Sequence, residues 1–326
     1  SRETSSIGVR PTMSRTLEKT CMSNKVVSGG GAMVLDGHDP LNENLKIAEA
    51  LDDATGQLSK VSESPRLDAE LLLARSLDVA RSYLFAHPEE PMDPGAAARF
   101  REVLDRRIEG MPMAYITGEK EFWSMTLMVN PATLVPRPDT ETLVEQALTR
   151  ISRRTAMRIV DLGTGSGAVA LAIARERPLC QVVATDVSTD ALAVASLNAR
   201  ELAIPNVEFV AGHWIEPIAG RTFDLVVSNP PYVASADPHL LALRHEPASA
   251  LAAGPDGLDA IREIAATAMS VLEPGGDLLI EHGADQADAV ADILRDNDWT
   301  DSSNVNDLSG RPRVSAARKP NRTKNL

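Results

Sequence analysis

The tetrapeptide Asn229-Pro230-Pro231-Tyr232 carries the most distinctive chemistry of this sequence. It follows the apolar run FDLVVS, residues 223 to 228, which is typical of a buried strand. Neither proline offers an N–H and each restricts the residue before it, so the strand ends here in a stiff segment. The Asn229 carboxamide oxygen and the Pro230 carbonyl oxygen form two acceptors suited to a planar –NH₂, and the ring of Tyr232 offers a face for stacking.

A planar amide or aromatic amine is a poor nucleophile because its lone pair is delocalised. Two acceptors aligned with its hydrogens position the nitrogen for in-line attack and favour the build-up of charge on it. Asn229, Pro230 and Tyr232 are therefore the catalytic candidates, and all four residues are candidates for binding the substrate. Taken alone, the tetrapeptide fits a rigid proline turn better. It indicates a reaction only together with the two motifs that precede it.

The segment VDLGTGSGAVALAIA, residues 160 to 174, predicts a ligand-binding turn. An apolar strand runs into three glycines and then directly into a helix, so the backbone can approach a ligand at the carboxyl edge of a sheet. A tight turn without a ligand gives the same pattern in many sequences. The spacing is G-x-G-x-G, which favours an adenosyl ligand without a pyrophosphate and so S-adenosylmethionine over NAD. The candidate cofactor-binding residues here are Gly163, Thr164, Gly165, Ser166 and Gly167.

Acidic and aromatic residues follow the next two strands. Asp186 stands nineteen residues beyond Gly167, where its carboxylate can accept both hydroxyls of a ribose. Trp214 follows the third strand and either covers an adenine face or plugs the end of the sheet. Asp161, in the strand before the glycines, either faces the amino group of the ligand or caps the turn. His213 has no identifiable partner, and a lone histidine is more often structural.

The elements that must position these residues alternate in type from Met157 onward. The predicted strands MRIVDLG, QVVATDV, VEFVAG, FDLVVSN and GDLLIEH are separated by helical segments, and the final pair NVNDLSGRPRVSAAR is typical of an antiparallel addition at or near one edge. The predicted fold is therefore α/β, a Rossmann-like S-adenosylmethionine-dependent methyltransferase domain with a doubly wound, mostly parallel sheet.

The N-terminal third predicts a different architecture. Helical periodicity begins at Leu41, with helix starts at Ser64-Pro65 and at Asp93. The predicted apolar faces of this helical bundle contain Leu67, Leu71, Leu72, Phe100, Val103, Leu104 and Ile108. A hairpin is expected near residues 121 to 135. The segment PRPDTE, residues 136 to 141, precedes a helix from about Thr140 and either lines the pocket or acts as a hinge.

These patterns divide the chain into five segments. Residues 1–40 are rich in Ser, Thr and Gly and read as a disordered leader or a segment added for expression. The predicted segments after them are an N-terminal helical domain (41–112), a β-hairpin linker (113–139), a methyltransferase domain (140–318) and a basic flexible tail (319–326).

Composition narrows the function classes. The chain of 326 residues is 43% hydrophobic and 24% charged, which is ordinary for a globular protein. It contains no apolar run long enough for a membrane span and no signal peptide, so a cytoplasmic location is the default. Two distant cysteines, Cys21 and Cys180, argue against a disulfide framework and a zinc site, and no metal-ligand cluster is expected. We expect a monomer because no surplus apolar segment remains.

The net charge of −13 is unevenly distributed. Residues 311 to 326 carry six basic and no acidic side chains, so the body of the chain is more acidic than the total indicates. An acidic body disfavours a broad electrostatic surface for nucleic acid, and no direct nucleic-acid recognition is expected.

With these motifs in place, the sequence resembles the HemK-type protein-(glutamine-N5) methyltransferases of peptide chain release factors. The resemblance spans roughly residues 64 to 318. It rests on the segments RLDAELLLA, AYITGEKEFW, LVPRPDTETLVE, VDLGTGSGAVALAIA, ATDVSTDAL, FDLVVSNPPYV, EPASAL, GPDGLDAIREI, LEPGGDLLIEHGADQ and GRPRV. Two features differ from the usual pattern: the long stretch before Leu41, and SMTLMVNPAT where a glycine-containing hairpin is common.

The resemblance implies roles for the motif residues. The glycine loop, Asp186, Trp214 and Asn229 would hold S-adenosylmethionine, which leaves as S-adenosyl-L-homocysteine. The tetrapeptide would grip the side-chain amide of the glutamine in the Gly-Gly-Gln motif of class I release factors. The helical domain would help to engage that protein, and the reaction would support translation termination.

Two other functions fit part of the pattern. An adenine-N6 DNA or RNA methyltransferase would use the same tetrapeptide on a flipped base, but should carry a basic target-reading region that this acidic chain lacks. A binding protein that has lost catalysis would be expected to have lost the tetrapeptide or the glycine loop, and both are intact.

Overall fold

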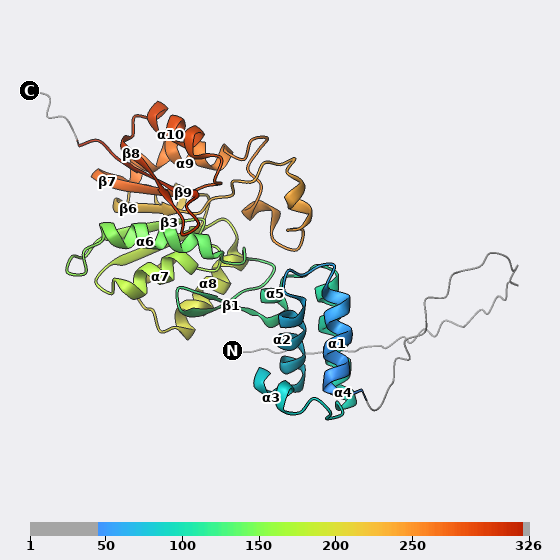
Figure 1. Cartoon of the computed structure of the whole chain (residues 1–326). Coiled ribbons are helices and arrows are strands. Elements are labelled where there is room, and N and C mark those ends of the chain that lie inside the picture. Colours follow the sequence, from blue (N-terminus) through green and yellow to red (C-terminus); the bar gives the residue numbers. More distant parts are fainter. Residues whose placement is uncertain (1–44, 322–326) are drawn as a thin grey trace, which may run out of the picture. The chain divides into compact units, whose positions relative to one another are not determined.

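The computed structural model describes residues 45–321 of the chain (Figure 1). The predicted leader, residues 1–40, and residues 322–326 of the predicted tail lie outside this range. No helix of the described part is long and apolar enough to cross a membrane. The segment boundaries predicted at residues 112 and 139 stay predictions.

Five helices form the N-terminal part. They are α1 (Ile47–Leu58), α2 (Pro65–Leu77), α3 (Arg81–Ala86), α4 (Pro94–Ile108) and α5 (Met113–Thr117). Both predicted helix starts are confirmed: Pro65 is the first residue of α2 after Ser64, and the Asp93 carboxylate accepts a hydrogen bond of 3.0 Å from the backbone N–H of Ala96. Capping of this kind satisfies one of the free N–H groups at a helix start.

The predicted apolar face of α2 is partly wrong. Leu72 is buried in the core of the helical part as expected, but Leu67 and Leu71 are each 40% exposed. The buried face of α2 instead consists of Ala69, Leu72 and Leu73, which pack in the same core as residues of α1 and α4. At 100° per residue, Leu67 and Leu71 project from the opposite side of the helix. The consecutive leucines allow two alternative apolar faces of the helix. Packing against α1 and α4 determines which of these faces is buried.

A short hairpin links the helices to the sheet domain. Strands β1 (Glu119–Phe122) and β2 (Met125–Met128) pair antiparallel, so the hairpin starts and ends earlier than predicted. Its two-residue turn uses Trp123 and Ser124 at φ 51° and 53°, which is typical of a tight hairpin. The Asn198 side chain fixes the hairpin: it accepts from Met128 N at 2.7 Å and donates to Met128 O at 3.0 Å.

The part of the chain after the hairpin contains a seven-stranded sheet in the order β5-β4-β3-β6-β7-β9-β8. Its strands are β3 (Arg158–Leu162), β4 (Gln181–Asp186), β5 (Val207–Ala211), β6 (Phe223–Ser228), β7 (Leu272–Glu281), β8 (Thr300–Asn306) and β9 (Pro312–Arg318). The first five in this order are parallel, whereas β9 runs antiparallel to β7 and β8 antiparallel to β9. The predicted doubly wound sheet with an antiparallel addition at one edge is confirmed.

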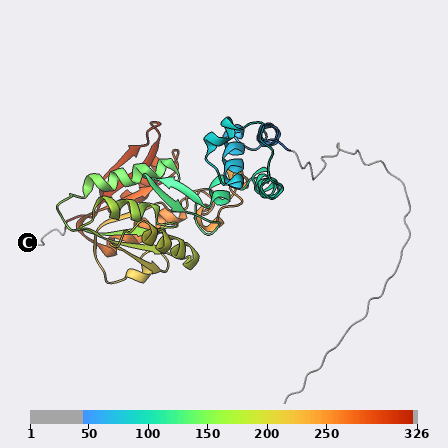
Figure 2. The same ribbon diagram turned by 90° about the horizontal axis from the view of Figure 1, so that it is seen from below.

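Helices cover both faces of this sheet (Figure 1 and Figure 2). The 3₁₀ turn η1 (Pro138–Thr140) leads into α6 (Glu141–Arg150), which shares one apolar core with α7 (Ala168–Glu176) and the end of α8 (Thr189–Glu201). The other face packs against α9 (Asp259–Thr267) and α10 (Ala287–Asp296). After β3, the next two strands in sequence, β4 and β5, lie on one side of β3 in the sheet. The chain then crosses over, and β6 lies on the other side of β3. The carboxyl ends of β3, β4 and β6 therefore meet at a switch point, where ligands bind in such folds.

Candidate active site

A cavity of about 510 Å³ opens at this switch point. Its size is in the range of small-molecule sites in proteins. It brings together Gly163, Thr164, Gly165, Ser166, Asp186, Trp214, Asn229 and Pro231 of the predicted site, together with Asp161 and His213. Gly167, Pro230 and Tyr232 are absent from its lining.

The glycine loop is held by hydrogen bonds to the end of the neighbouring strand β4. The N–H groups of Gly163 and Thr164 both donate to the Thr185 carbonyl at 2.9 Å. The Asp186 carboxylate accepts from Gly165 N at 2.8 Å and from Ser188 N at 2.9 Å. Asp186 therefore shapes the loop as well as facing the cavity, a role that the sequence did not reveal.

Two of the glycines are required for different reasons. At Gly163, where φ is 74°, a Cβ would approach the Trp214 ring to 3.0 Å. At Gly167, where φ is 84°, a Cβ would meet Ala195 and Leu171 at 3.1 Å. Gly163 thus leaves room for the indole beside the cavity, whereas Gly167 permits α7 and α8 to pack closely.

Asp161 is fully buried at the end of β3 and also lines the cavity. Burial raises the pKa of its carboxyl to about 7, although the Thr164 hydroxyl and the Ala170 backbone N–H act in the opposite direction. The Thr164 hydroxyl donates to Asp161 Oδ2 at 2.6 Å, so the residue caps the glycine turn. Its place in the lining also leaves it facing the space for a ligand, and both sequence interpretations keep support.

Replacing Asp161 by asparagine is expected to stabilise the protein increasingly as the pH rises. Because the pKa in the folded state lies above the ordinary value of 3.8, the stability contributed by the protonated carboxyl is full below about pH 4 and lost as the pH rises through about 7. By linkage, the shifted pKa of Asp161 lowers the free energy of unfolding by about 4 kcal/mol at pH 8.5. At pH 5.5 this destabilisation is smaller by about 2 kcal/mol. Asparagine keeps an acceptor for Thr164 and carries no charge.

The measurement is urea-induced unfolding of both proteins at pH 5.5 and pH 8.5 without ligand. Asp292→Asn, which removes an exposed carboxylate of α10 together with its surface ion pair to Arg295, measures the effect of losing a carboxylate that is not buried. A stability difference between Asp161→Asn and the parent that is the same at both pH values would contradict the prediction.

Trp214 and His213 share one partner. The Trp214 indole N–H donates to Glu263 Oε2 at 3.3 Å, and His213 Nδ1 lies 3.2 Å from Glu263 Oε1. The prediction that His213 has no partner is wrong, because Glu263 lies on α9, some fifty positions along the chain. Trp214 lines the cavity and also packs against the apolar core beneath α9, so both of the roles that the sequence left open keep support.

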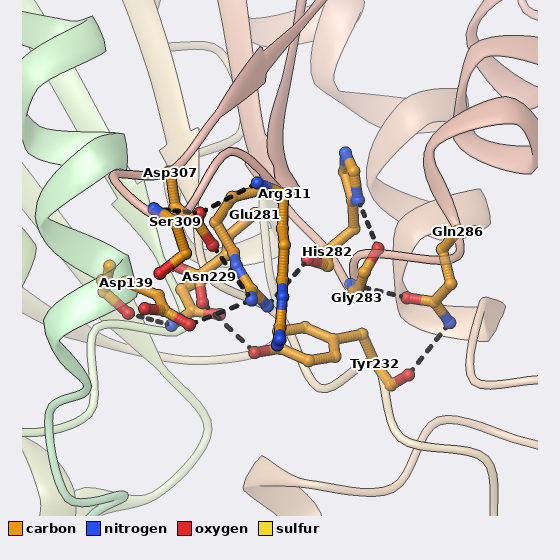
Figure 3. A network of polar contacts seen from close by, with 12 residues as sticks. Asp139, Asn229, Tyr232, Glu281, His282, Gly283, Gln286, Asp307, Ser309 and Arg311 are labelled. Carbon is orange, nitrogen blue, oxygen red and sulfur yellow. Dashed lines mark hydrogen bonds and ion pairs between the residues drawn. The ribbon is translucent and has the colours of Figure 1, made fainter.

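The tetrapeptide presents its members to different environments. Asn229 Nδ2 donates to the Thr140 hydroxyl oxygen at 3.1 Å, which leaves the carboxamide oxygen as the acceptor for a ligand. Pro230 is buried, and Pro231 lines the cavity. Tyr232 lies behind the lining, where its hydroxyl donates to Glu281 Oε1 at 3.2 Å (Figure 3). Burial, followed by the nearby Glu281 carboxylate, raises the pKa of Tyr232.

The segment PRPDTE lies at the cavity, where Pro136, Arg137 and Thr140 form part of the wall. It is anchored by Glu246, whose buried carboxylate accepts from Arg137 Nη2 at 2.5 Å and from Val135 N at 3.0 Å. A pocket wall and a hinge fit the sequence of this segment equally well. The long separation between Arg137 and Glu246 along the chain hides this contact from any local pattern.

Other lining residues were missed by sequence reasoning. They are Ala132, Thr133, Leu134, Ala168, Val169, Val187, Ser188, Asp190, Ala191, Gly212, Pro247, Ser249, Ala250, Ala252, Ala253, Asp259, Ala260 and Glu263. Those next to Asp186 and Trp214 could have been inferred from adjacency to a motif. Across residues 45–321, no group of three or more His, Cys, Asp or Glu is arranged to hold a metal ion.

The cavity carries five carboxylates, Asp161, Asp186, Asp190, Asp259 and Glu263, against the cationic side chain of Arg137. Such a lining suits a ligand with positive charge and disfavours a pyrophosphate. The Asp186 carboxylate suits the hydroxyls of a ribose, and the Trp214 indole suits a planar base. These residues therefore fit S-adenosylmethionine, which combines an adenosine with a sulfonium and an ammonium group.

Two family models match parts of this chain. The family model described as PrmC N-terminal domain matches residues 49–118, and the model described as Methyltransferase small domain matches residues 139–246. Among solved structures, a methyltransferase from Pyrococcus furiosus matches with a TM-score of 0.47 at 19% identity, covering 60% of this chain and 89% of that one.

Curated relatives match over nearly their whole length. The release factor glutamine methyltransferase of Xylella fastidiosa is 48% identical over 257 residues, 78% of this chain and 94% of the relative. The protein of that name from Coxiella burnetii is 46% identical over 84% of this chain and 99% of its own length, and the one from Escherichia coli is 43% identical over 82% and 97%. This chain therefore belongs to the family of release factor glutamine methyltransferases.

Proposed function

We propose that this protein transfers a methyl group from S-adenosylmethionine to the side-chain amide nitrogen of the glutamine in the Gly-Gly-Gln motif of class I peptide chain release factors. One observation carries the proposal: the Asn229 carboxamide is held through its Nδ2, and its oxygen has no hydrogen-bond partner among residues 45–321, at the same cavity that the glycine loop and Asp186 line. A planar amide nitrogen and a methyl donor can therefore be bound side by side. The names of the relatives support the choice of acceptor.

Each part of the site has a proposed task. Residues 163–167, Asp186 and Trp214 bind the cofactor, which supplies an electrophilic methyl group when bound. Asn229 Oδ1 and the Pro230 carbonyl accept the two N–H bonds of the glutamine amide. The nitrogen is thereby aligned with the methyl carbon, and positive charge that develops on it is stabilised. Methyl transfer would form the N–C bond and break the C–S bond of the donor, and the proton given up by the amide nitrogen would pass to water.

Pro231 and Tyr232 complete the substrate site in this proposal. Pro231 forms part of the cavity wall near Asn229, and Tyr232 is the next residue in the sequence. We further propose that the enzyme acts in the cytoplasm as a monomer and recognises its protein substrate without binding nucleic acid directly. The helical part, residues 41–112, is proposed to help engage the release factor.

The function is tested with labelled S-adenosylmethionine and two forms of a class I release factor, one with Gly-Gly-Gln and one with Gly-Gly-Ala. The expected result is label on the first form alone. Label on the Gly-Gly-Ala form, or on duplex DNA or RNA offered in its place, would refute the glutamine assignment. Gel filtration with light scattering tests the monomer.

A further inference from the structure

Glu281 is a buried carboxylate that the proposed reaction does not yet use. It is the last residue of β7 and has no exposed surface. The Tyr232 hydroxyl donates to its Oε1, whereas Oε2 has no hydrogen-bond partner among the described residues. A buried carboxylate is costly unless it is bonded or paired, so its retention at the end of an apolar strand calls for a reason.

Thr140 connects this carboxylate to the substrate site. Its hydroxyl oxygen accepts from Asn229 Nδ2 at 3.1 Å, and its own proton is then available for another acceptor. The Thr140 hydroxyl faces Glu281 and lowers the pKa of that carboxyl, as expected of a hydrogen-bond donor. A chain of contacts thus runs from Glu281 through the Thr140 hydroxyl to the Asn229 carboxamide.

Ionisable side chains from three other elements lie around Glu281, among them Tyr232 and Asp139 (Figure 3). Arg313 on β9 lies opposite it and forms ion pairs of 2.9 Å with Asp139 and 3.4 Å with Asp307. Asp139 approaches from η1, and Tyr232 from the segment after β6. Burial raises the pKa of the Glu281 carboxyl to about 7; Arg313 acts in the opposite direction by favouring the ionised form, and Asp139 adds to the increase.

We propose that Glu281 is a positioning residue for both side chains of the tetrapeptide: it holds the Tyr232 ring directly and the Asn229 carboxamide through one intervening hydroxyl. A carboxamide has two orientations that differ only in which atom faces the substrate. An acceptor at Thr140 selects the orientation with Nδ2 inward and Oδ1 toward the glutamine. The ionised Glu281 enforces this arrangement, because a carboxylate draws the Thr140 proton and leaves the Thr140 oxygen to accept.

This arrangement gives a reason for three sequence segments outside the primary motifs. PRPDTE supplies Thr140 and Asp139, LLIEH supplies Glu281, and GRPRV supplies Arg313. They are distant in sequence and come together behind Asn229. The inference rests on the proposed function, since it assigns these residues to the orientation of the amide acceptor.

The test compares Thr140→Val, Thr140→Ser and Thr142→Val in the full chain, with the Gly-Gly-Gln release factor as substrate. Valine has the shape of threonine without the hydroxyl. We expect Thr140→Val to lower kcat by about 10- to 100-fold, because a misoriented acceptor loses both alignment and charge stabilisation. The KM for the factor and the Kd for S-adenosylmethionine, measured by calorimetry, should stay within about threefold.

The two other variants separate positioning from folding. Thr140→Ser restores the hydroxyl and is expected to recover kcat to within about fivefold of the parent. Thr142, a buried threonine of α6 outside the cavity lining, controls for the loss of a hydroxyl in this region. Equal losses in all three variants, a parental kcat in Thr140→Val, or a fall of cofactor affinity in parallel with kcat would each overturn the inference.

A pH profile tests Glu281 itself. In the parent, kcat should rise from pH 6 to pH 8 as the carboxyl ionises, and Glu281→Gln should have lost this limb because the amide does not titrate. A limb that persists unchanged in Glu281→Gln would overturn the role of Glu281. If the parent protein fails to label the release factor, the proposed function has failed. If the parent labels the factor and the Thr140→Val and Glu281→Gln variants behave like the parent, this inference alone has failed.

Discussion

Replacement of Asn229 by alanine is expected to lower kcat for methylation of the Gly-Gly-Gln factor by about 10²- to 10³-fold, the effect typical of removing one preorganised charge-stabilising contact. In the proposed reaction, the carboxamide oxygen accepts one N–H of the substrate amide, and alanine has no acceptor in its place. The Pro230 carbonyl alone would fix one N–H and leave the nitrogen free to rotate away from the methyl group. The loss should therefore be in the chemical step.

Binding of S-adenosylmethionine should largely survive this change. The glycine loop and Asp186 come from the ends of β3 and β4, whereas Asn229 follows β6. We expect the Kd of the cofactor, measured by calorimetry, to stay within about tenfold of the parent. A variant that no longer binds the cofactor would place Asn229 mainly in the cofactor site and contradict the proposed role.

Asn229→Asp gives a sharper comparison. Aspartate keeps an oxygen acceptor but loses the N–H that bonds to the Thr140 hydroxyl, and it adds a carboxylate near Asp139 and Glu281. It should be less active than the parent for a different reason than alanine, namely like charge and lost orientation. Asn297→Ala, at the end of α10, controls for removal of a remote carboxamide and should leave kcat unchanged.

The cavity shows what the sequence could predict. Each primary motif lies within a few residues of a strand end, so local pattern alone placed the glycine loop, Asp186 and Asn229 at one edge of a parallel sheet. The strand order that joins β3 to β6 follows from alternating strands and helices with a return crossover. These features are encoded in short windows of sequence.

The partners of these residues are not encoded in that way. Thr140 and Asn229, Glu263 and Trp214, and Tyr232 and Glu281 each lie tens of positions apart, and none of these pairs has a periodic signal. Their contacts depend on how η1, α9 and β7 pack around the cavity. The same limit explains the error at α2, where tertiary packing chose between two helical faces that the leucines allow equally.

The second large effect is expected at Asp186. Replacement by alanine should weaken S-adenosylmethionine binding by at least about 100-fold, because hydrogen bonds to a charged group contribute about 1.5–3 kcal/mol each. The carboxylate accepts from the N–H groups of Gly165 and Ser188. Its loss removes an acceptor for the ribose and also releases two backbone groups that shape the loop.

Asp190→Asn separates these effects from the loss of negative charge. Asp190 lines the same cavity from the first turn of α8, and its replacement removes one carboxylate from the acidic lining. We expect a decrease in cofactor affinity of no more than about tenfold, because one exposed charge contributes little when screened by solvent. Equal losses in Asp186→Ala and Asp190→Asn would mean that charge alone, and not the hydrogen bonds to the loop, governs affinity.

Kinetics at saturating cofactor distinguish the two large effects from each other. If Asp186 acts on cofactor binding, its alanine variant should recover most of the parental kcat once S-adenosylmethionine exceeds the raised Kd, since an interaction made equally in the ground state and the transition state changes KM and not kcat. Asn229→Ala should show no such recovery, because its contact gains strength only as charge develops on the nitrogen. A kcat that stays about 100-fold low in Asp186→Ala at saturation would mean that the shape of the glycine loop is itself needed to align the methyl group.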